Sequence, residues 1–109
     1  MANFFRNKVI TGVGMTPVTA VETLVNSSAT VIGLSLANIT DNLVTANVYI
    51  RDADSVVGHY IKEVMVPPNT SLRVINGGEK LIMANLNGLL VSCNVDSGID
   101  AIISYVEII

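Results

Sequence analysis

Apolar and polar residues alternate along much of the chain with the two-residue period of a β-strand. The clearest stretch is residues 43–51, where apolar residues at the even positions alternate with Thr, Asn, Tyr and Arg at the odd positions. This pattern predicts an antiparallel strand with one buried and one wet face. Residues 29–38 alternate as well, and strict alternation places Ile32 on the same face as Leu34 and Leu36, with Val31 on the other.

The same pattern predicts further strands, and helix signals are few. They cover residues 9–13, 18–24, 57–66, 71–75, 80–84, 89–95 and 99–109. Helix competes at residues 19–25 and 79–86, but neither segment combines a cap with an apolar helical period, so we favour strand. About eight evenly spaced strands predict a single-domain antiparallel β-sandwich, either jelly-roll or immunoglobulin-like.

Turn residues separate the predicted strands. Residues 52–55, Asp-Ala-Asp-Ser, supply side chains that bond their own backbone and close a hairpin. Pro67 and Pro68 end the next strand, because proline cannot donate to a strand ladder. Residues 76–78, Asn-Gly-Gly, tolerate the positive φ of a tight turn. We expect the Pro-Pro and Gly-Gly turns to serve the architecture rather than to bind a ligand.

The length of 109 residues suits one domain. The opening residues 1–8 do not continue a strand alternation, so we expect an N-terminal arm there and a sandwich over residues 9–109. Phe4 and Phe5 are too apolar to extend into water without cost, and Arg6 suits an acidic rim, which favours docking of the arm on a neighbour. The alternative is that the two Phe cover the end of the domain's own sandwich.

Charge is scarce, at 14% of residues against about 25% in an average soluble domain. The last predicted strand, residues 99–109, is apolar on both faces and needs cover on both. Depletion of charge is typical of the core of protein interfaces. We therefore expect a homo-oligomer or attachment to a larger assembly, with Phe4, Phe5, Arg6 and Tyr105 contacting the partner. A monomer with a surface rich in Thr, Ser and Asn is the alternative.

Two classes of partner are disfavoured. Nine acidic and six basic residues give a formal charge of −3, the wrong sign for binding nucleic acid. No run approaches the ~18 to 20 apolar residues that cross a bilayer, and the first residues lack the apolar centre of a secretory signal. We expect synthesis in a cytoplasm and no membrane partner.

Residues suited to catalysis are few. Cys93 lies within an apolar alternation, which predicts a buried and inert thiol. His59 follows Gly58 at the start of a strand and is expected at a surface or interface. A Cys-His dyad is a remote alternative, and one Cys with one His cannot assemble a zinc site. We expect no catalytic residue and no cofactor.

Acidic residues gather at two turns. Asp52 with Asp54, and Asp96 with Asp100, offer carboxylate oxygens of the kind that bind calcium. Their spacing does not reach the EF-hand pattern, and turn chemistry explains them more simply. No complete phosphate-binding glycine motif is present.

The segment from residue 66 to residue 82, VPPNTSLRVINGGEKLI, resembles a recurrent segment of small virion structural proteins of tailed bacteriophages, particularly those that infect marine cyanobacteria. Residues 1–8, 30–36 and 104–108 fit the same type. The likeness therefore covers most of the chain, although the shared motif is one of turns and short strands.

This resemblance implies a β-sandwich structural protein that is present in many copies in the virion and is made in the host cytoplasm. Its partners would be other copies and other virion proteins, in the capsid, neck or tail. A capsid decoration protein or a neck or tail accessory subunit fits this description. A receptor- or glycan-recognition module of a phage fibre is the alternative, although a chain with no Trp, three Tyr and two Phe has few aromatic platforms for sugars.

Overall fold

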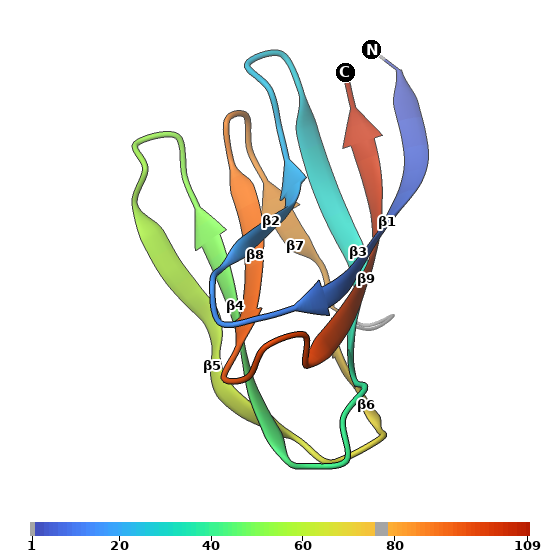
Figure 1. Cartoon of the computed structure of the whole chain (residues 1–109). Helices are drawn as coiled ribbons and strands as arrows, with labels where there is room; N and C mark the ends of the chain where they lie inside the picture. The colour runs from blue at the N-terminus through green and yellow to red at the C-terminus, as the bar shows by residue number, and fades with distance from the viewer. Residues whose placement is uncertain (1, 76–78) are drawn as a thin grey trace.

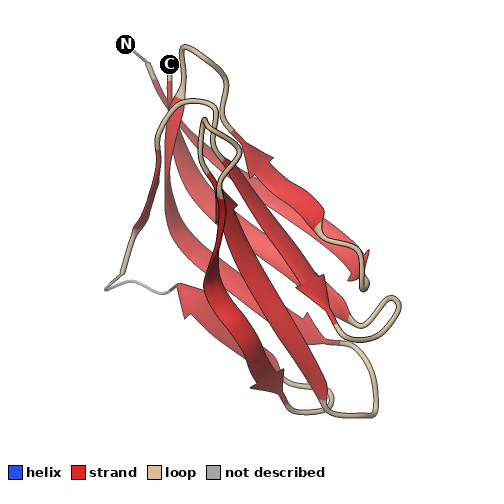
Figure 2. Cartoon of the chain, turned by 90° about the vertical axis from the view of Figure 1, so that its left-hand side faces the viewer, coloured by secondary structure: helices blue, strands red, loops and turns tan. Residues whose placement is uncertain are grey.

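The computed structural model describes residues 2–75 and 79–109, and every regular element in that part is a strand. The strands are β1 (Asn3–Val13), β2 (Val18–Glu22), β3 (Ser28–Asn38), β4 (Val44–Arg51), β5 (Val57–Val66), β6 (Ser71–Ile75), β7 (Leu81–Met83), β8 (Gly88–Cys93) and β9 (Ile99–Ile108). They form two antiparallel sheets that pack face to face (Figures 1 and 2). The predicted single-domain β-sandwich is confirmed.

The order of strands identifies the type of sandwich. The first sheet has the order β1-β9-β3-β6, with β7 also paired to β3, and the second sheet has the order β2-β8-β4-β5. Because β6 and β7 pair with successive parts of β3, they take the place of one strand. The resulting order is that of a jelly roll, whereas an immunoglobulin fold keeps its first two strands in one sheet.

Side chains on the inner faces of the two sheets form one apolar core. In β4, Val44, Ala46 and Val48 are buried and alternate with partly exposed polar residues, as the sequence pattern predicts. Of the two segments where helix competed, residues 19–25 overlap β2 and residues 79–86 contain β7. Aliphatic and β-branched side chains explain this choice, because they pack well on a pleated, half-buried surface.

A bulge in β3 corrects the strict alternation predicted for residues 29–38. Val31 lies opposite Tyr105 of β9 and Gly33 lies opposite Ser104, so Ile32 is an extra residue on the β3 side. The extra residue shifts the alternation by one position. Val31 is therefore buried on the same face as Leu34 and Leu36, and Ile32 is turned toward solvent.

The predicted N-terminal arm is also corrected. Residues 3–8 are the first half of β1 and pair in continuous register with β9, from Asn3 opposite Ile108 to Lys8 opposite Ile103. The backbones of Ala2 and Ile109 exchange hydrogen bonds of 2.9 and 3.0 Å, so the described ends of the chain lie side by side (Figure 1). Backbone pairing with the C-terminal strand holds this segment in the domain, despite its irregular side-chain pattern.

The turns follow the predicted chemistry where the structure describes them. The Asp52 carboxylate accepts the backbone N–H groups of Asp54 and Val56 at 2.9 and 3.0 Å, which closes the β4–β5 hairpin. After Pro67 and Pro68, Asn69 has a φ of 55°, as expected at the third position of a type II turn. The predicted Asn-Gly-Gly turn at residues 76–78 lies outside the described residues.

Asn38, at the end of β3, is a buried polar residue that ties three parts of the chain together. Its Nδ2 donates to the carbonyl oxygens of Asn42 and Val66 at 2.8 and 2.9 Å, and its Oδ1 accepts from the backbone N–H and hydroxyl of Thr40. These bonds join the β3–β4 connection to the end of β5 at one end of the sandwich.

Replacing Asn38 with Ala is expected to lower the free energy of unfolding by about 1–3 kcal/mol, because it leaves buried backbone groups without partners. Chemical denaturation measures this change. The control is Asn42→Ala, whose side chain is exposed in the same loop and should change stability by less than about 0.5 kcal/mol. Equal effects of the two substitutions would contradict the role assigned to Asn38.

Candidate interaction surface

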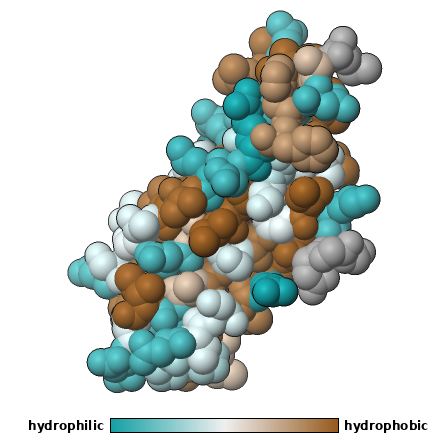
Figure 3. Space-filling model, turned by 90° about the vertical axis from the view of Figure 1, so that its right-hand side faces the viewer, coloured by the Kyte–Doolittle hydropathy of each residue, from teal (hydrophilic) through white to brown (hydrophobic). Residues whose placement is uncertain are grey.

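The outer face of the first sheet carries large apolar side chains in contact with water. We call these residues the apolar face: Phe5, Val9, Ile32, Ile82, Ile102, Val106 and Ile108. Phe5 is 83% exposed, Ile82 66%, Val9 56% and Ile102 47%. Figure 3 shows apolar side chains gathered over the side of the molecule that carries β1, β9 and β3. Within residues 2–75 and 79–109, the outer side of β9 therefore stays at least partly exposed to water.

Strand register arranges this face in rows that cross the sheet, because residues in register share a face. One row consists of Phe5, Val106, Thr30 and Ile82. Another consists of Val9, Ile102, Ser35 and Arg73. Between them lies a row of small or polar residues, Asn7, Ser104 and Gly33. The centre of the face is uncharged, and Arg73 and Asp100 stand toward one end.

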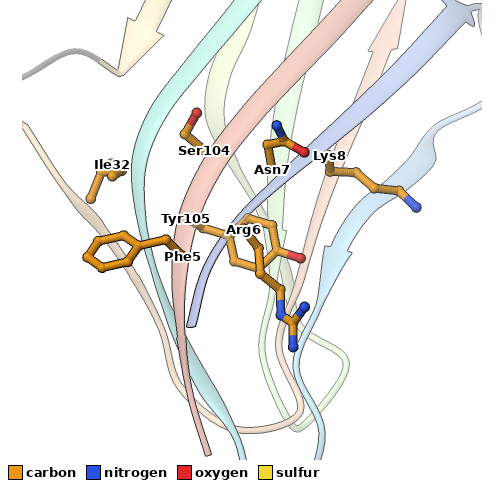
Figure 4. Close-up of a pocket in the computed structure, with 7 residues that line it drawn as sticks. All are labelled: Phe5, Arg6, Asn7, Lys8, Ile32, Ser104 and Tyr105. Atoms are coloured by element: carbon orange, nitrogen blue, oxygen red, sulfur yellow. The ribbon is translucent and has the colours of Figure 1, made fainter. Parts of the chain in front are cut away.

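A shallow depression follows from this arrangement. The short Ser104 side chain lies between two rows of larger residues and lines a hollow of about 740 Å³ (Figure 4). The other lining residues are Phe5, Arg6, Asn7, Lys8, Ile32 and Tyr105. Phe5 and Ile32 border it on the outer side of the sheet. A smaller neighbouring hollow shares Ser104 and extends toward Arg73. The face therefore combines a flat apolar surface with a groove.

The four predicted partner-binding residues lie close together but on two sides of the sheet. Phe5 points to the outer side, whereas Arg6 and Tyr105, which are opposite each other in register, point to the inner side (Figure 4). Phe4 shares the inner side by strand alternation. Whether these residues contact a partner stays a prediction.

The three residues on the inner side, Phe4, Arg6 and Tyr105, already make contacts within the chain. Arg6 donates to Glu107 at 2.6 Å, and its guanidinium lies 5.0 Å from the centre of the Phe4 ring. Tyr105 packs against the core. Of the four residues, Phe5 is the one that presents its whole ring to solvent.

Ile32, Ile82 and Ile102 were not identified as surface residues from the sequence. The apolar character of both sides of residues 99–109 signalled the contribution of Ile102, but the bulge that exposes Ile32 leaves no clear pattern. Ile82 lies in β7, the shortest strand, where three apolar residues in succession hide the alternation.

The outer face of the second sheet is different, because its polar side chains bond one another. The Tyr49 hydroxyl lies 2.7 Å from the Ser92 hydroxyl, and Asn47 accepts the backbone N–H of Glu63 at 2.8 Å. The Tyr49 and His59 rings lie 4.7 Å apart. Arg51 and Glu22 also form an ion pair across this face, at 2.7 Å. This face is more polar than the apolar face, although Val57 and Met65 of β5 are exposed on it.

Cys93 and His59 do not form a dyad. Cys93 is buried on the inner side of the second sheet, and its thiol donates to the carbonyl oxygens of Val13 and Val95 at 3.1 and 3.0 Å. His59 lies opposite Tyr49 on the outer side. The predicted buried thiol is confirmed, and the sheet separates it from the imidazole.

Two of the acidic residues that suggested a calcium site, Asp52 and Asp100, accept backbone N–H groups. Asp52 caps its own hairpin, and Asp100 accepts the backbone N–H of Gly12 at 2.9 Å. Over residues 2–75 and 79–109, no three His, Cys, Asp or Glu side chains come together in a way that could hold a metal ion. The same residues include no helix long and apolar enough to span a membrane.

Comparisons with known protein families, with curated proteins and with solved structures find no match for this chain.

The burial of Cys93 leads to a testable prediction. A thiol reagent should modify Cys93 at least about 1,000-fold more slowly in the native protein than in denaturant. Reaction requires the core to open, and the closed state outweighs the open state by at least about 1,000-fold. Reaction with an aromatic disulfide, followed by absorbance, measures both rates. Rapid labelling of the native protein would show that this end of the core opens readily.

Proposed function

We propose that this chain is a non-enzymatic structural component of a tailed-phage virion, which attaches to other virion proteins through the apolar face. The proposal rests on the exposed apolar side chains that lie in rows across the outer face of the first sheet. Aliphatic and aromatic side chains are exposed there in two rows, with uncharged small or polar residues between them. A patch of this kind is typical of surfaces that become buried in an assembly.

The dimensions of the molecule suit an interface of ordinary size. The chain measures 45 × 27 × 21 Å along its principal axes. A broad side of such a body can supply the ~800 Å² per partner that stable interfaces bury. At roughly 25 cal/mol per Å² of apolar surface, transfer of this face out of water is a substantial driving force, which is offset in part by the entropy lost on association.

Two further observations support a virion role. The resemblance drawn from residues 66–82 in the sequence analysis implies such a role, and the jelly roll is a fold used by viral capsid proteins. The same fold also occurs in lectins and cupins, so it does not decide function alone. Capsid decoration and a neck or tail accessory position both place the apolar face against a larger protein surface.

The polar face of the second sheet supports a second candidate, a receptor- or glycan-recognition module of a phage fibre. Tyr49 and His59 form a small aromatic pair next to the hydroxyl of Ser92, and sugar sites combine aromatic rings with such polar groups. Glycan-array binding that is lost in Tyr49→Ala would favour this function.

The main proposal predicts that Ile102→Asp reduces incorporation into phage particles at least about tenfold, since an unpaired charge is costly to bury in an apolar interface. The melting temperature should stay within a few degrees, because Ile102 points to solvent in the free chain. Quantitative mass spectrometry of purified particles measures incorporation.

The matched control is Thr45→Asp, which introduces the same carboxylate near the start of β4, on the outer face of the second sheet. It should leave incorporation unchanged. Normal incorporation of Ile102→Asp would show that the apolar face is not the attachment surface, and absence of the wild-type chain from particles would refute the virion role itself.

A further inference from the structure

The sandwich has four open sheet edges, and three of them are unsuited to pairing with another strand. Unpaired edges are commonly protected by shortness, bulges or charge. β2 has five residues and a register shift, and β6 and β7 are short strands that divide one edge between them. β5 is longer, but its pairing shifts twice and Glu63 has a φ of 51°, so its edge is irregular.

The edge of β1 is long and regular over most of its length, and Arg6 and Lys8 are the charged residues along it. β1 has eleven residues, and its register with β9 is continuous from Asn3 to Ile10. Exposure on both faces along this stretch leaves room for a neighbouring strand, and β1 forms one outer edge of the molecule in Figure 1. The charge of Arg6 could hinder pairing at this edge, but its side chain forms an ion pair with Glu107 of β9.

The backbone groups available at this edge follow from the pairing with β9. Ala2 and Ile109 exchange both backbone hydrogen bonds, and such pairs alternate along an antiparallel ladder. The even-numbered residues of this stretch therefore bond β9. Asn3, Phe5, Asn7 and Val9 direct their N–H and C=O groups away from the sheet, ready to accept another strand.

We propose that β1 of one copy pairs antiparallel with β1 of a second copy, about a two-fold axis at Phe5. The two first sheets then join into one continuous sheet across the dimer. Asn3, Phe5 and Asn7 of each copy supply the backbone hydrogen bonds, with Asn3 opposite the second copy's Asn7. Main-chain pairing of this kind is a common mode of recognition at an exposed edge.

Charge selects this register. A two-fold axis at Asn7 would place Arg6 opposite the second copy's Lys8, and an axis at Arg6 would place the two Arg6 side chains together; like charges directly opposite are destabilising. An axis at Phe5 instead places Arg6 beside the second copy's Phe4, a cation–π arrangement that the chain already makes internally at 5.0 Å. An axis at Phe4 also separates the cations, but it pairs a shorter part of β1.

The dimer doubles the apolar face. Phe5 lies on the outer side, so the two Phe5 rings meet at the axis and the apolar rows of both copies run on across the joined sheet. This pairing specifies how copies associate, and it does not require the virion role. The main tests therefore use the purified chain, and incorporation into particles only distinguishes a second copy from another protein's strand.

Asn7→Pro is the first test, because it removes an outward N–H but no hydrogen bond to β9, and proline is tolerated at such edge positions. Asn7→Ala is the control, since it keeps the N–H. Sedimentation equilibrium should show a wild-type dimer, an Asn7→Ala dimer of similar affinity, and an Asn7→Pro chain that associates at least about tenfold more weakly.

Disulfide trapping tests the register independently of Asn7→Pro. In the proposed dimer the two Cα atoms at position 5 lie about 5.5 Å apart, within reach of a disulfide. Phe5→Cys should therefore form a covalent dimer under mild oxidation. Asn7→Cys should not, because the two copies of position 7 are separated by several residues along the ladder. The native Cys93 is buried and does not interfere.

A wild-type chain that stays monomeric at about 100 μM, together with equal cross-linking of Phe5→Cys and Asn7→Cys, would overturn the dimer. Preferential cross-linking of Asn7→Cys would overturn the register. A monomeric wild-type chain whose incorporation into particles is lost only in Asn7→Pro would show that another protein's strand occupies the edge, which also contradicts pairing between copies.

Discussion

The pairing of β9 with β1 on one side and β3 on the other is the interaction on which the rest of the structure depends. It joins the two ends of the described chain, where Ala2 bonds Ile109, and it forms the centre of the first sheet. Its register sets the rows of the apolar face, because Phe5 and Val9 meet Val106 and Ile102 across it. It also determines which backbone groups of β1 stay free at the edge. The arrangement of the first sheet, the rows of the apolar face and the free backbone groups of β1 thus follow from one set of backbone hydrogen bonds.

The two outer faces of the sandwich differ in character. On the second sheet, the polar side chains of Tyr49, Ser92 and Asn47 bond one another, so these groups are already partnered within the chain. The first sheet has one apolar side against the core and another apolar side in water. The centre of this outer side carries no charge. This asymmetry gives the molecule one side suited to solvent and one suited to burial against another protein, which is what attachment to a larger particle requires.

Much of the fold could be predicted from the sequence, because a period of two reports strands directly. The prediction for residues 57–66 and 71–75 matches β5 and β6, and the charge-poor, two-faced last strand indicated an exposed apolar surface. The jelly-roll order could not be separated from an immunoglobulin order, since local periodicity does not show which strands meet. The arm assigned to residues 1–8 was wrong because long-range pairing with β9, rather than local pattern, makes it a strand. The bulge at Ile32 and the hydrogen bonds of Asn38 likewise depend on partners far along the chain.

The most direct measurement of the central claim is an electron-cryomicroscopy map of the parent phage particle at side-chain resolution. The account predicts repeated copies of this jelly roll, each with Phe5, Ile102 and Val106 buried against another virion protein and with Tyr49 facing solvent. Copies that turn Phe5 and Ile102 outward to solvent, or bind through the face of Tyr49, would contradict it.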